Sequence, residues 1–270
     1  MTDTFGDLSA DTPALTPDPY LADSLSPYFR GLVLDGDQHL VDESYRLRYQ
    51  VYCHERHFLP AEEYPTQLET DAYDPYSVHV GVLNNQGSLV ATARMVRRSE
   101  LGFPLLLHCA IDDGRILRAA PHRAVVEISR LAVSRDYNRR AGDHFYSLQG
   151  LDPRKVGEKR KGGGEIVMAL YKAVYQASKR RRCTHWLMAA EPALRRLLSR
   201  IGVPFYPIGP ESDYYGLVSP YGLDLSDFDA VITSGRIPIL TEFLDGLEPE
   251  FSPSRAVADA SPSGHASLGA

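Results

Sequence analysis

The chain has 270 residues and a mass of 30.0 kDa, with 43% hydrophobic residues, 24% charged residues and a formal net charge of −6. These values are typical of a globular protein with a core, and they exclude a disordered, collagen-like or coiled-coil chain. The mild acidity disfavours a dedicated nucleic-acid binder, because such proteins carry a basic excess. Cys53, Cys109 and Cys183 lack the paired spacing of a disulfide framework or a zinc site, so we expect no bound metal and a reducing, cytoplasmic location.

The sequence contains no pattern typical of a signal peptide, and no run reaches the ~18 apolar residues that a transmembrane helix needs. Residues 1–27 and 252–270 are rich in proline and in small or polar residues, and they offer little apolar surface to bury. Such segments cannot offset their ordering entropy, so we predict two flexible tails. We expect residues 28–251 to form one domain.

The predicted elements start with a helix over Asp42–His54, where Leu47 and Val51 lie one turn apart on one face. Residues 77–83 and 88–96 are rich in strand formers and are separated by Asn84-Asn85-Gln86-Gly87, which predicts a β-hairpin. Residues 124–134 mix apolar and polar positions in a way that favours a central strand with one functional face.

The second half of the chain continues with alternating helices and strands. Gly162-Gly163-Gly164 opens a predicted helix over Glu165–Arg181, whose apolar residues form a stripe. A short strand follows at His185–Ala190, and a further helix runs from Pro192 to a stop at Gly202. Residues 205–247 are rich in Tyr and Pro, and we expect one or two more strands there. This order predicts an α+β domain with a mixed central β-sheet flanked by helices.

Four spaced groups of polar and aromatic residues stand out along the predicted domain. In chain order they are Arg48 with Tyr52 and Phe58, Asp71 with Asp74, Arg94, and the run Glu127-Ile128-Ser129-Arg130. Their order resembles that of the N-acyl-homoserine-lactone synthases, which have an R-x-x-x-F-x5-W element, a D-x-x-D pair, an arginine and an E-x-S-R strand. In this chain Tyr52 replaces the phenylalanine and Phe58 replaces the tryptophan.

A closer resemblance covers about residues 35–245. There the chain is similar to the PEP-CTERM/exosortase system-associated acyltransferases and to the neighbouring N-acyl amino acid synthases. The similarity rests on the strand sequence EISRLAVS, an arginine-rich loop, a helix, a short strand ending near E-P-x-L, and the segment YGLVSPY at residues 215–221. It implies a GNAT-like acyl-CoA N-acyltransferase fold, in which two splayed parallel strands admit the pantetheine arm of a thioester. The strand at residues 124–134 would present backbone amides to the thioester carbonyl.

The resemblance also implies a set of site residues. An attacking amine must lose a proton, and Glu127 is the first candidate base, while Ser129 and Arg130 belong to the same catalytic strand. We expect substrate-binding residues in the ion-pair cluster and its aromatic neighbours: Arg48, Tyr52, Phe58, Asp71, Asp74 and Arg94. Three alternatives stay open: Glu127 faces solvent or pairs with Arg130, Ser129 is an ordinary strand hydroxyl, and the charged cluster is a surface network of little energetic consequence.

A basic region at residues 154–182 carries ten basic and two acidic residues, a local charge of +8 in a chain of net −6. Such an asymmetry indicates an anionic partner, and an acyl carrier protein fits it. Phosphate contacts are expected at Arg139, Arg140, Gly162, Gly163 and Gly164, because a helix N-terminus favours phosphate. The chain lacks the Q/R-x-x-G-x-G/A signature of coenzyme A sites, so either thioester stays open as the donor. For Lys179–Arg182 the alternative is that they complement a helix C-terminus.

The sequence therefore predicts an N-acyltransferase. It would transfer an acyl group, with a long chain preferred, from an acyl-carrier-protein or acyl-CoA thioester to a small amine such as an amino acid. The thioester is a co-substrate, and no permanently bound cofactor is expected. Two alternatives are a small-group acetyltransferase that uses acetyl-CoA and a non-catalytic module that binds acyl thioesters or a carrier protein. Acyl length, the amine and the oligomeric state are not determined by the sequence.

Overall fold

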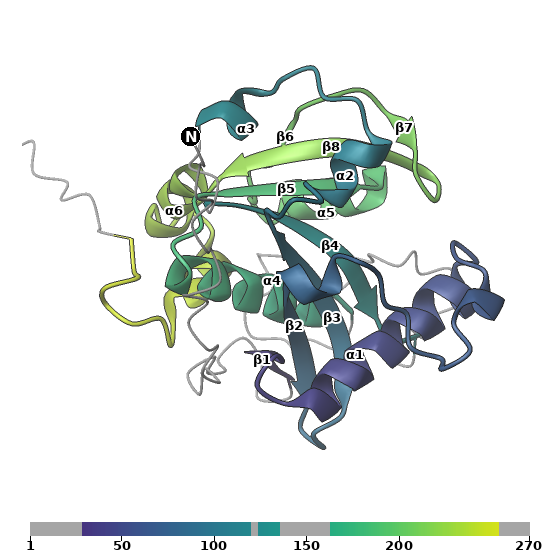
Figure 1. The fold of residues 1–270 in the computed structure, drawn as a ribbon. Coiled ribbons are helices and arrows are strands. Elements are labelled where there is room, and N and C mark those ends of the chain that lie inside the picture. Colours follow the sequence, from purple (N-terminus) through teal and green to yellow (C-terminus); the bar gives the residue numbers. More distant parts are fainter. Residues whose placement is uncertain (1–28, 120–123, 136–162, 254–270) are drawn as a thin grey trace, which may run out of the picture.

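The computed structural model describes residues 29–119, 124–135 and 163–253, which build a mixed sheet in the order β1-β2-β3-β4-β5-β8-β6, with β7 pairing to β8 (Figure 1). The strands are β1 (Phe29–Val33), β2 (Ser77–Asn84), β3 (Leu89–Arg97), β4 (Val125–Val133), β5 (His185–Ala190), β6 (Tyr206–Pro207), β7 (Ser212–Asp213) and β8 (Leu217–Asp224). The α-helices are α1 (Gln38–Tyr49), α2 (Pro104–His108), α3 (Arg115–Ala119), α4 (Gly163–Arg180), α5 (Pro192–Arg200), α6 (Leu225–Thr233) and α7 (Pro238–Thr241). None of the helices in these ranges is long and apolar enough to cross a bilayer.

Helix α1 begins where Asp37 caps it, since its carboxylate accepts hydrogen bonds from the backbone N–H groups of His39 and Leu40. It runs directly into a π-helix over Gln50–Glu55. The predicted helix over Asp42–His54 is confirmed, but it starts four residues earlier and its last turn changes pitch. Single-turn π segments inside helices are rare and cluster at functional sites, which directs attention to this end of the helix.

The predicted β-hairpin is formed by β2 and β3. Its turn is closed by the Asn84 side chain, which accepts hydrogen bonds from the backbone N–H groups of Gln86 and Ser88. Gly87 has a φ of 82°, a conformation that glycine adopts without strain. The hairpin places β2 and β3 at the centre of the antiparallel half of the sheet.

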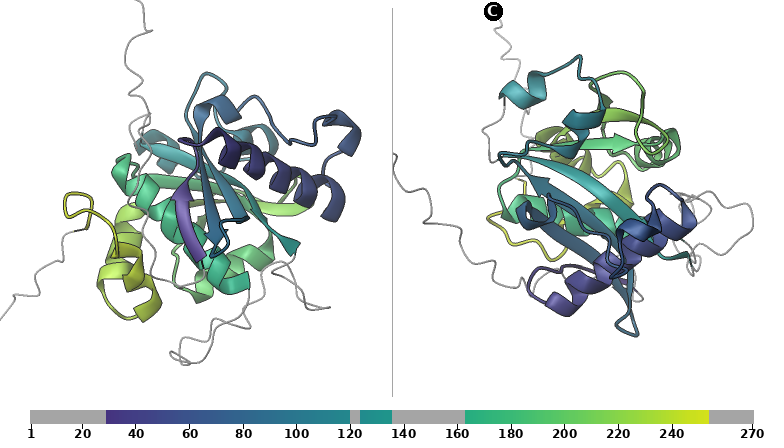
Figure 2. Two further views of the ribbon diagram at one scale, coloured as in Figure 1. Left: turned by 90° about the horizontal axis from the view of Figure 1, so that it is seen from below. Right: turned by 45° about the vertical axis from the view of Figure 1, so that its right-hand side comes forward.

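Helices cover both faces of the sheet (Figure 2). Helix α4 packs against β1, β2 and β3, and this layer holds the larger core, with Trp186, Tyr171, Tyr175, Phe228 and Phe243 among its fully buried members. Gly31 lets β1 approach α4, because a Cβ there would lie 2.8 Å from Ala173 Cβ and 2.9 Å from the Ala169 carbonyl oxygen. Helix α1 covers the opposite face over β3 and β4.

One strand pair breaks the antiparallel order and creates the feature on which the site depends. Strands β4 and β5 are parallel, but they pair over only three positions, from Val125 with His185 to Glu127 with Leu187. Strand β4 continues to Val133 and β5 to Ala190, so the two strands separate beyond Glu127. This is the splayed pair of parallel strands that the resemblance implies.

The strands and helices predicted at residues 124–134, 165–181, 185–190 and 192–202 are confirmed as β4, α4, β5 and α5. Five of the strands and α-helices were not predicted, namely β1, α2, α3, α6 and α7, and residues 205–247 hold three strands, β6, β7 and β8, where one or two were expected. The predicted tail at residues 1–27 and most of the one at 252–270 lie outside the described residues, and the limits of the domain stay a prediction.

Candidate active site

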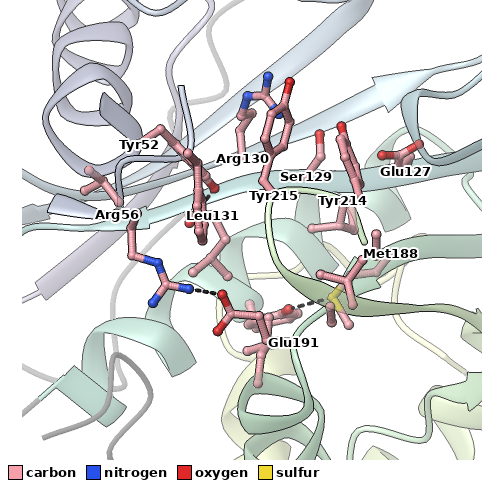
Figure 3. Close-up of a pocket in the computed structure, with 18 residues that line it drawn as sticks. Tyr52, Arg56, Glu127, Ser129, Arg130, Leu131, Met188, Glu191, Tyr214 and Tyr215 are labelled. Atoms are coloured by element: carbon pink, nitrogen blue, oxygen red, sulfur yellow. Dashed lines mark hydrogen bonds and ion pairs between the residues drawn. The ribbon is translucent and has the colours of Figure 1, made fainter. Parts of the chain in front are cut away.

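A cavity of about 120 Å³ lies in the gap between β4 and β5, directly after their last paired residues. One wall is β4 from Glu127 to Leu131, and the other is formed by Met188 to Glu191 at the end of β5. Tyr171 of α4 closes it on one side of the sheet, where its hydroxyl group donates to Met188 Sδ at 3.4 Å. Figure 3 shows the residues that line this space.

Strand β4 carries a bulge beside the cavity. Its register with β3 passes from Thr92–Ala132 to Arg94–Ser129, so β4 has one more residue than its partner, and Arg130 adopts a φ of 51°. Ser129 points to the same side of β4 as Glu127, as strand alternation requires, and the bulge turns Arg130 to that side as well (Figure 3). Because β5 does not pair with β4 beyond Glu127, backbone groups of this segment of β4 face the gap.

Glu127 lies at the point where the strands separate and is only 2% exposed. Its Oε2 accepts a hydrogen bond from the backbone N–H of Leu105 at 2.9 Å. Burial raises the pKa of this carboxyl to about 7, and the Leu105 N–H and the charges of Arg94 and Arg130 oppose the rise only in part. A carboxyl that titrates near neutral pH can accept and release a proton at that pH. Because the side chain is buried, the alternative that Glu127 faces solvent is wrong.

Aromatic rings form the outer wall of the cavity. Tyr52 comes from the π-helix and donates a hydrogen bond to the Leu131 carbonyl oxygen at 3.0 Å. The Tyr215 ring stacks on Phe58 with centroids 6.4 Å apart, and Tyr214 stacks on His108 of α2 at 3.9 Å. The turn between β7 and β8 thereby connects Phe58, which follows the π-helix, to His108 of α2.

An ion pair also crosses the gap. Arg56, which follows the π-helix, binds the carboxylate of Glu191 at the start of α5. Both side chains are 27% exposed and line the cavity, and the Arg56 guanidinium lies over the Phe58 ring at 4.7 Å. The pair connects the α1 side of the molecule to the β5 side at the cavity mouth (Figure 3).

Beside the cavity, three arginines and three carboxylates form a buried cluster between α1 and the sheet. Arg48 binds Glu69 at 2.5 Å and Asp74 through both terminal nitrogens, at 2.7 and 3.1 Å. Arg94 binds Asp71 at 2.5 Å and Asp74 at 3.0 Å. Its neighbour on β4, Arg130, completes the set with contacts to Glu69 at 3.1 Å and Asp71 at 3.3 Å.

The burial of this cluster decides one of the open alternatives. The side chains of Arg48 and Arg94 are each 1% exposed, and that of Glu69 is not exposed at all. A solvated surface network of little energetic consequence is therefore wrong, because loss of one partner in a buried set leaves an uncompensated charge. Burial alone would raise the pKa of both Asp71 and Asp74. The hydrogen bond with His79 and the charges of Arg48 and Arg94 instead hold the pKa of Asp74 below its usual value, and Arg94 and Arg130 do the same for Asp71.

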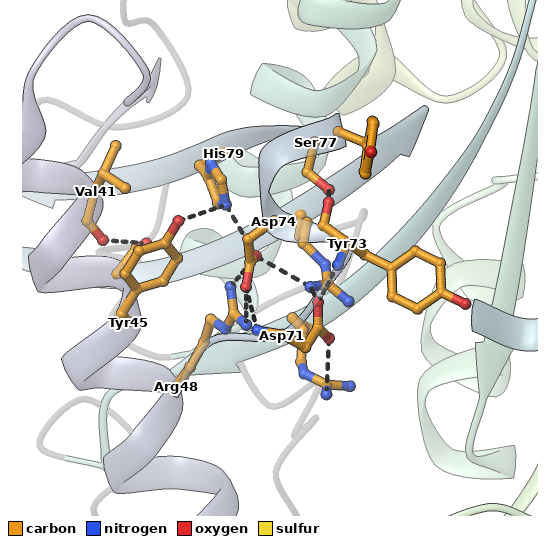
Figure 4. Close-up of polar contacts among 12 residues, drawn as sticks. Val41, Tyr45, Arg48, Asp71, Tyr73, Asp74, Ser77 and His79 are labelled. Atoms are coloured by element: carbon orange, nitrogen blue, oxygen red, sulfur yellow. Dashed lines mark hydrogen bonds and ion pairs between the residues drawn. The ribbon is translucent and has the colours of Figure 1, made fainter. Parts of the chain in front are cut away.

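The cluster extends through His79 on one side and reaches the cavity on the other. His79 of β2 contacts Asp74 at 3.1 Å (Figure 4). Its other ring nitrogen lies 2.8 Å from Asp35. Arg94 Nε donates to Ser129 Oγ at 3.3 Å, and Ser129 lines the cavity. Arg94 Nη2 is buried and has no partner among the described residues.

The structure thus divides the predicted residues into two adjoining groups. Glu127, Ser129, Arg130, Tyr52 and Phe58 line the cavity. The other four predicted substrate-binding residues, Arg48, Asp71, Asp74 and Arg94, form the buried cluster next to it. Their functional roles stay predictions.

The phosphate-contact predictions fall mostly elsewhere. Gly163 and Gly164 begin and continue the first turn of α4, and Arg139, Arg140 and Gly162 lie outside the described residues, as do residues 154–162 of the basic region. At the other end of α4, Lys179 binds Asp229 at 2.6 Å and Arg180 binds Glu248 at 2.8 Å. Both positive charges are neutralised by ion pairs within the chain, so these two side chains do not contribute to a basic surface for an anionic partner.

Sequence reasoning missed several residues that the structure brings to the site, namely Asp35, Arg56, Glu69, His79, Tyr171, Glu191 and Tyr214. Two of them carried a signal. His79 is a single polar residue inside the apolar run Val78–Leu83, and Glu69 precedes Asp71 by two residues. Among the described residues, no group of three His, Cys, Asp or Glu side chains is arranged to hold a metal ion.

Comparison with known proteins identifies the type of domain that contains this cavity. Residues 47–147 match the family profile described as Acetyltransferase (GNAT) domain. The mixed sheet flanked by helices and the separated β4–β5 pair agree with that domain. The predicted α+β, GNAT-like acyltransferase fold is therefore confirmed, and with it the prediction that the chain has the domain of an acyltransferase enzyme.

Many solved structures share the fold, and three of them illustrate it. TofI, in a ternary complex with an inhibitor and MTA, is 20% identical with a TM-score of 0.52, covering 74% of this chain and 96% of TofI. BjaI, a CoA-dependent acyl-homoserine lactone synthase with SAM and isopentyl-CoA, is 16% identical with a TM-score of 0.53, covering 82% and 89%. FeeM, an N-acyl amino acid synthase from uncultured soil microbes, is 15% identical with a TM-score of 0.50, covering 77% and 96%.

At these identities the similarity to solved structures establishes the fold and leaves the substrates to be argued from the site. No curated protein sequence matches the chain. The resemblance to acyl-homoserine lactone and N-acyl amino acid synthases is confirmed as a structural similarity.

Proposed function

We propose that the chain is an N-acyltransferase that moves an acyl group from the thioester of an acyl carrier protein or coenzyme A to a small amine, with an amino acid as the first candidate. The observation that carries the proposal is the position of Glu127. It is a buried carboxyl with a pKa of about 7, and it lines the cavity where β4 and β5 separate. A structural glutamate would gain nothing from such a place, because its charged form is destabilised there.

The proposed reaction has one covalent exchange. The donor arm enters between β4 and β5, and its thioester carbonyl lies against backbone N–H groups near the β4 bulge. The amine nitrogen attacks the carbonyl carbon, Glu127 takes the amine proton directly or through a water, and the C–S bond breaks as the C–N bond is completed. The thiolate leaves and is protonated. Oriented N–H donors to the oxyanion contribute ~3 to 4 kcal/mol each, and a positioned base ~10²- to 10⁴-fold in rate.

Arg94 supplies a specific atom for the proposed binding of the acceptor. Its Nε–H and one N–H of Nη2 lie along the same edge of the guanidinium, and the Nε–H already donates to Ser129 at the cavity. The Nη2 nitrogen is buried without a partner among the described residues, which is costly unless an acceptor atom binds to it. Because Arg94 does not itself line the cavity, a water that bridges to a polar oxygen of the substrate would fill this position.

A second candidate is a small-group acetyltransferase that uses acetyl-CoA, and the cavity size favours it. The cavity of about 120 Å³ is below the roughly 300 to 1,000 Å³ typical of ligand pockets. A long acyl chain, which the sequence resemblance favours, needs the aromatic wall of Tyr52, Phe58, Tyr214 and Tyr215 to move. Acyl length is therefore the variable that separates the two candidates.

The finer parts of the proposal rest on the sequence. The motifs EISRLAVS and YGLVSPY support membership of the PEP-CTERM/exosortase system-associated group, and the unpaired spacing of the three cysteines supports a cytoplasmic location. The basic residues at 154–161 support an acyl carrier protein as donor, and Arg139, Arg140 and Gly162 to Gly164 are the proposed contacts for its phosphate or that of coenzyme A.

The test is a transfer assay with purified protein, in which acyl carrier protein and coenzyme A thioesters from acetyl to hexadecanoyl are combined with a set of amino acids. Mass spectrometry measures the amide product. Glu127→Gln should lose ~10²- to 10⁴-fold in rate, and the matched change Glu43→Gln on the exposed face of α1 should retain it. Product formation that is equal in both variants would contradict the role of Glu127. Donor binding without product in the wild type would favour a non-catalytic binding module.

A further inference from the structure

We propose that His79 is a positioning residue for this reaction: it is held as an imidazolium between Asp35 and Asp74, and its charge keeps Arg94 in place against Ser129 at the cavity. The inference rests on the proposed function, which does not assign a role to His79. His79 does not line the cavity. It acts through the chain Asp74, Arg94 and Ser129.

The hydrogen bonding of the His79 imidazole ring indicates that both ring nitrogens carry a proton. Nδ1 lies 2.8 Å from Asp35 Oδ1, and Nε2 lies 3.1 Å from Asp74 Oδ1. An ionised carboxylate only accepts hydrogen bonds, so each ring nitrogen must donate. A neutral imidazole carries one N–H and cannot satisfy both carboxylates. The geometry therefore requires the doubly protonated, positively charged ring.

The charge balance of the buried cluster also favours a positively charged His79. With Asp35 included, the described residues contribute four carboxylates, Asp35, Glu69, Asp71 and Asp74, against the three guanidinium groups of Arg48, Arg94 and Arg130. Glu69 and Asp74 are almost fully buried, so solvent does not compensate the excess negative charge. A charged His79, which is itself 4% exposed, makes the cluster neutral.

Side-chain contacts connect His79 to the cavity. In the sheet register, His79 of β2 stands opposite Arg94 of β3, and Arg94 stands opposite Ser129 of β4. The three side chains form a row across the strands, and Asp74 bridges the first two. By holding Asp74, His79 holds Nη1 of Arg94, so that the edge formed by Nε and Nη2 stays turned to β4.

The groups that face the ring all belong to this arrangement. Asp35 follows β1, Tyr45 and Arg48 come from α1, Asp74 precedes β2, and Arg94 lies on β3. The Tyr45 ring meets the imidazole edge-on with centroids 5.4 Å apart, and its hydroxyl lies 3.4 Å from Nε2. Burial lowers the pKa of His79, but the hydrogen bonds to Asp35 and Asp74 outweigh it and raise that pKa above the usual value.

Loss of the His79 proton at alkaline pH should therefore disturb Arg94 and lower the rate. In the wild type, kcat/KM should rise with pH as Glu127 becomes a base and fall again as His79 loses its charge, which gives a bell-shaped profile. His79→Gln should lower kcat roughly tenfold near neutral pH and remove the alkaline decrease. His39→Gln, the same change at an exposed position on α1, should leave the profile unchanged.

Asp35→Asn provides a variant that keeps the histidine. It removes one negative partner of the ring, so the alkaline decrease should move to lower pH. A profile in which His79→Gln retains the alkaline decrease, or in which Asp35→Asn leaves it in place, would overturn the inference.

A measurement without turnover separates this inference from the proposed function. With ¹⁵N-labelled histidine, NMR should show both His79 ring nitrogens protonated at neutral pH in the wild type, and one protonated nitrogen would overturn the inference. If the charged ring is present but no acyl donor or amine gives product, the proposed function fails and the positioning role fails with it. If product forms and the ring is neutral, the proposed function stands and only the role of His79 is wrong.

Discussion

Glu127→Gln should make the protein more stable at alkaline pH while it abolishes most of the activity. The substitution keeps the size of the side chain and leaves an oxygen for the Leu105 N–H. In the folded protein the carboxyl has a pKa of about 7, against 4.5 for an ordinary glutamate. At about 1.4 kcal/mol per pKa unit, ionising the buried carboxyl costs about 3 kcal/mol of folding stability.

The sign follows from which state holds the proton more tightly. Because the folded pKa of Glu127 is raised, the unfolded chain loses this proton first, and the folded state becomes less stable as pH rises from about 4.5 to about 7. Above that range the full cost is present. Glutamine has no proton to lose, so the stability difference between variant and wild type should grow by about 3 kcal/mol between pH 4.5 and pH 8.

Urea denaturation of both proteins at a series of pH values measures this difference. Other titrating groups contribute to each curve, but they are common to the two proteins and cancel in the comparison. A difference that stays constant over this pH range would mean that Glu127 titrates as an ordinary glutamate. The argument for a base with a pKa near 7 would then be wrong, whatever the activity of the variant.

Three further changes test the packing and the charges around the site. Asp74→Asn should cost about 3 to 5 kcal/mol in urea denaturation, because the buried guanidinium groups of Arg48 and Arg94 lose a charged partner; a loss below 1 kcal/mol would refute this. Tyr52→Phe should cost about 1 kcal/mol, since the Leu131 carbonyl loses its donor, and no change would mean that water replaces the hydroxyl. Gly31→Ala should lower the melting temperature because its Cβ would meet α4 at 2.8 Å, and an unchanged melting temperature would show that β1 can shift.

The sequence predicted those elements whose local signals agree with the final structure. The hairpin of β2 and β3 consists of two runs of strand-forming residues joined by a turn that contains Asn and Gly. The local sequence is therefore enough to predict it. Helix α5 begins with Pro192 and ends before Gly202, which has a φ of 86°. In contrast, β1 is only five residues long and contains Gly31, a residue that weakens a strand signal but is required by contact with α4.

The sequence predicted those site residues that the family resemblance supplied. It did not predict the residues that reach the site through contacts between segments distant in the chain. Glu127 and Ser129 were identified from one strand. The partners Asp35 and His79 are 44 residues apart in sequence, and their contact exists only because β1 pairs with β2. The raised pKa of Glu127 also could not be read from the sequence, because it depends on how completely α2 and its neighbours exclude water.

The gap between β4 and β5 arises where backbone pairing stops, so it does not depend on the identity of any one side chain around it. Its aromatic wall comes from two separate surface segments, the π-helix and the turn at Tyr214 and Tyr215, while the charged cluster lies behind the strand. Evolution or an engineer could therefore exchange the turn to accommodate new acyl groups and leave the proton-accepting machinery untouched. Under the proposed function, a few substitutions at this rim would change which acyl groups fit, with Glu127 left in place.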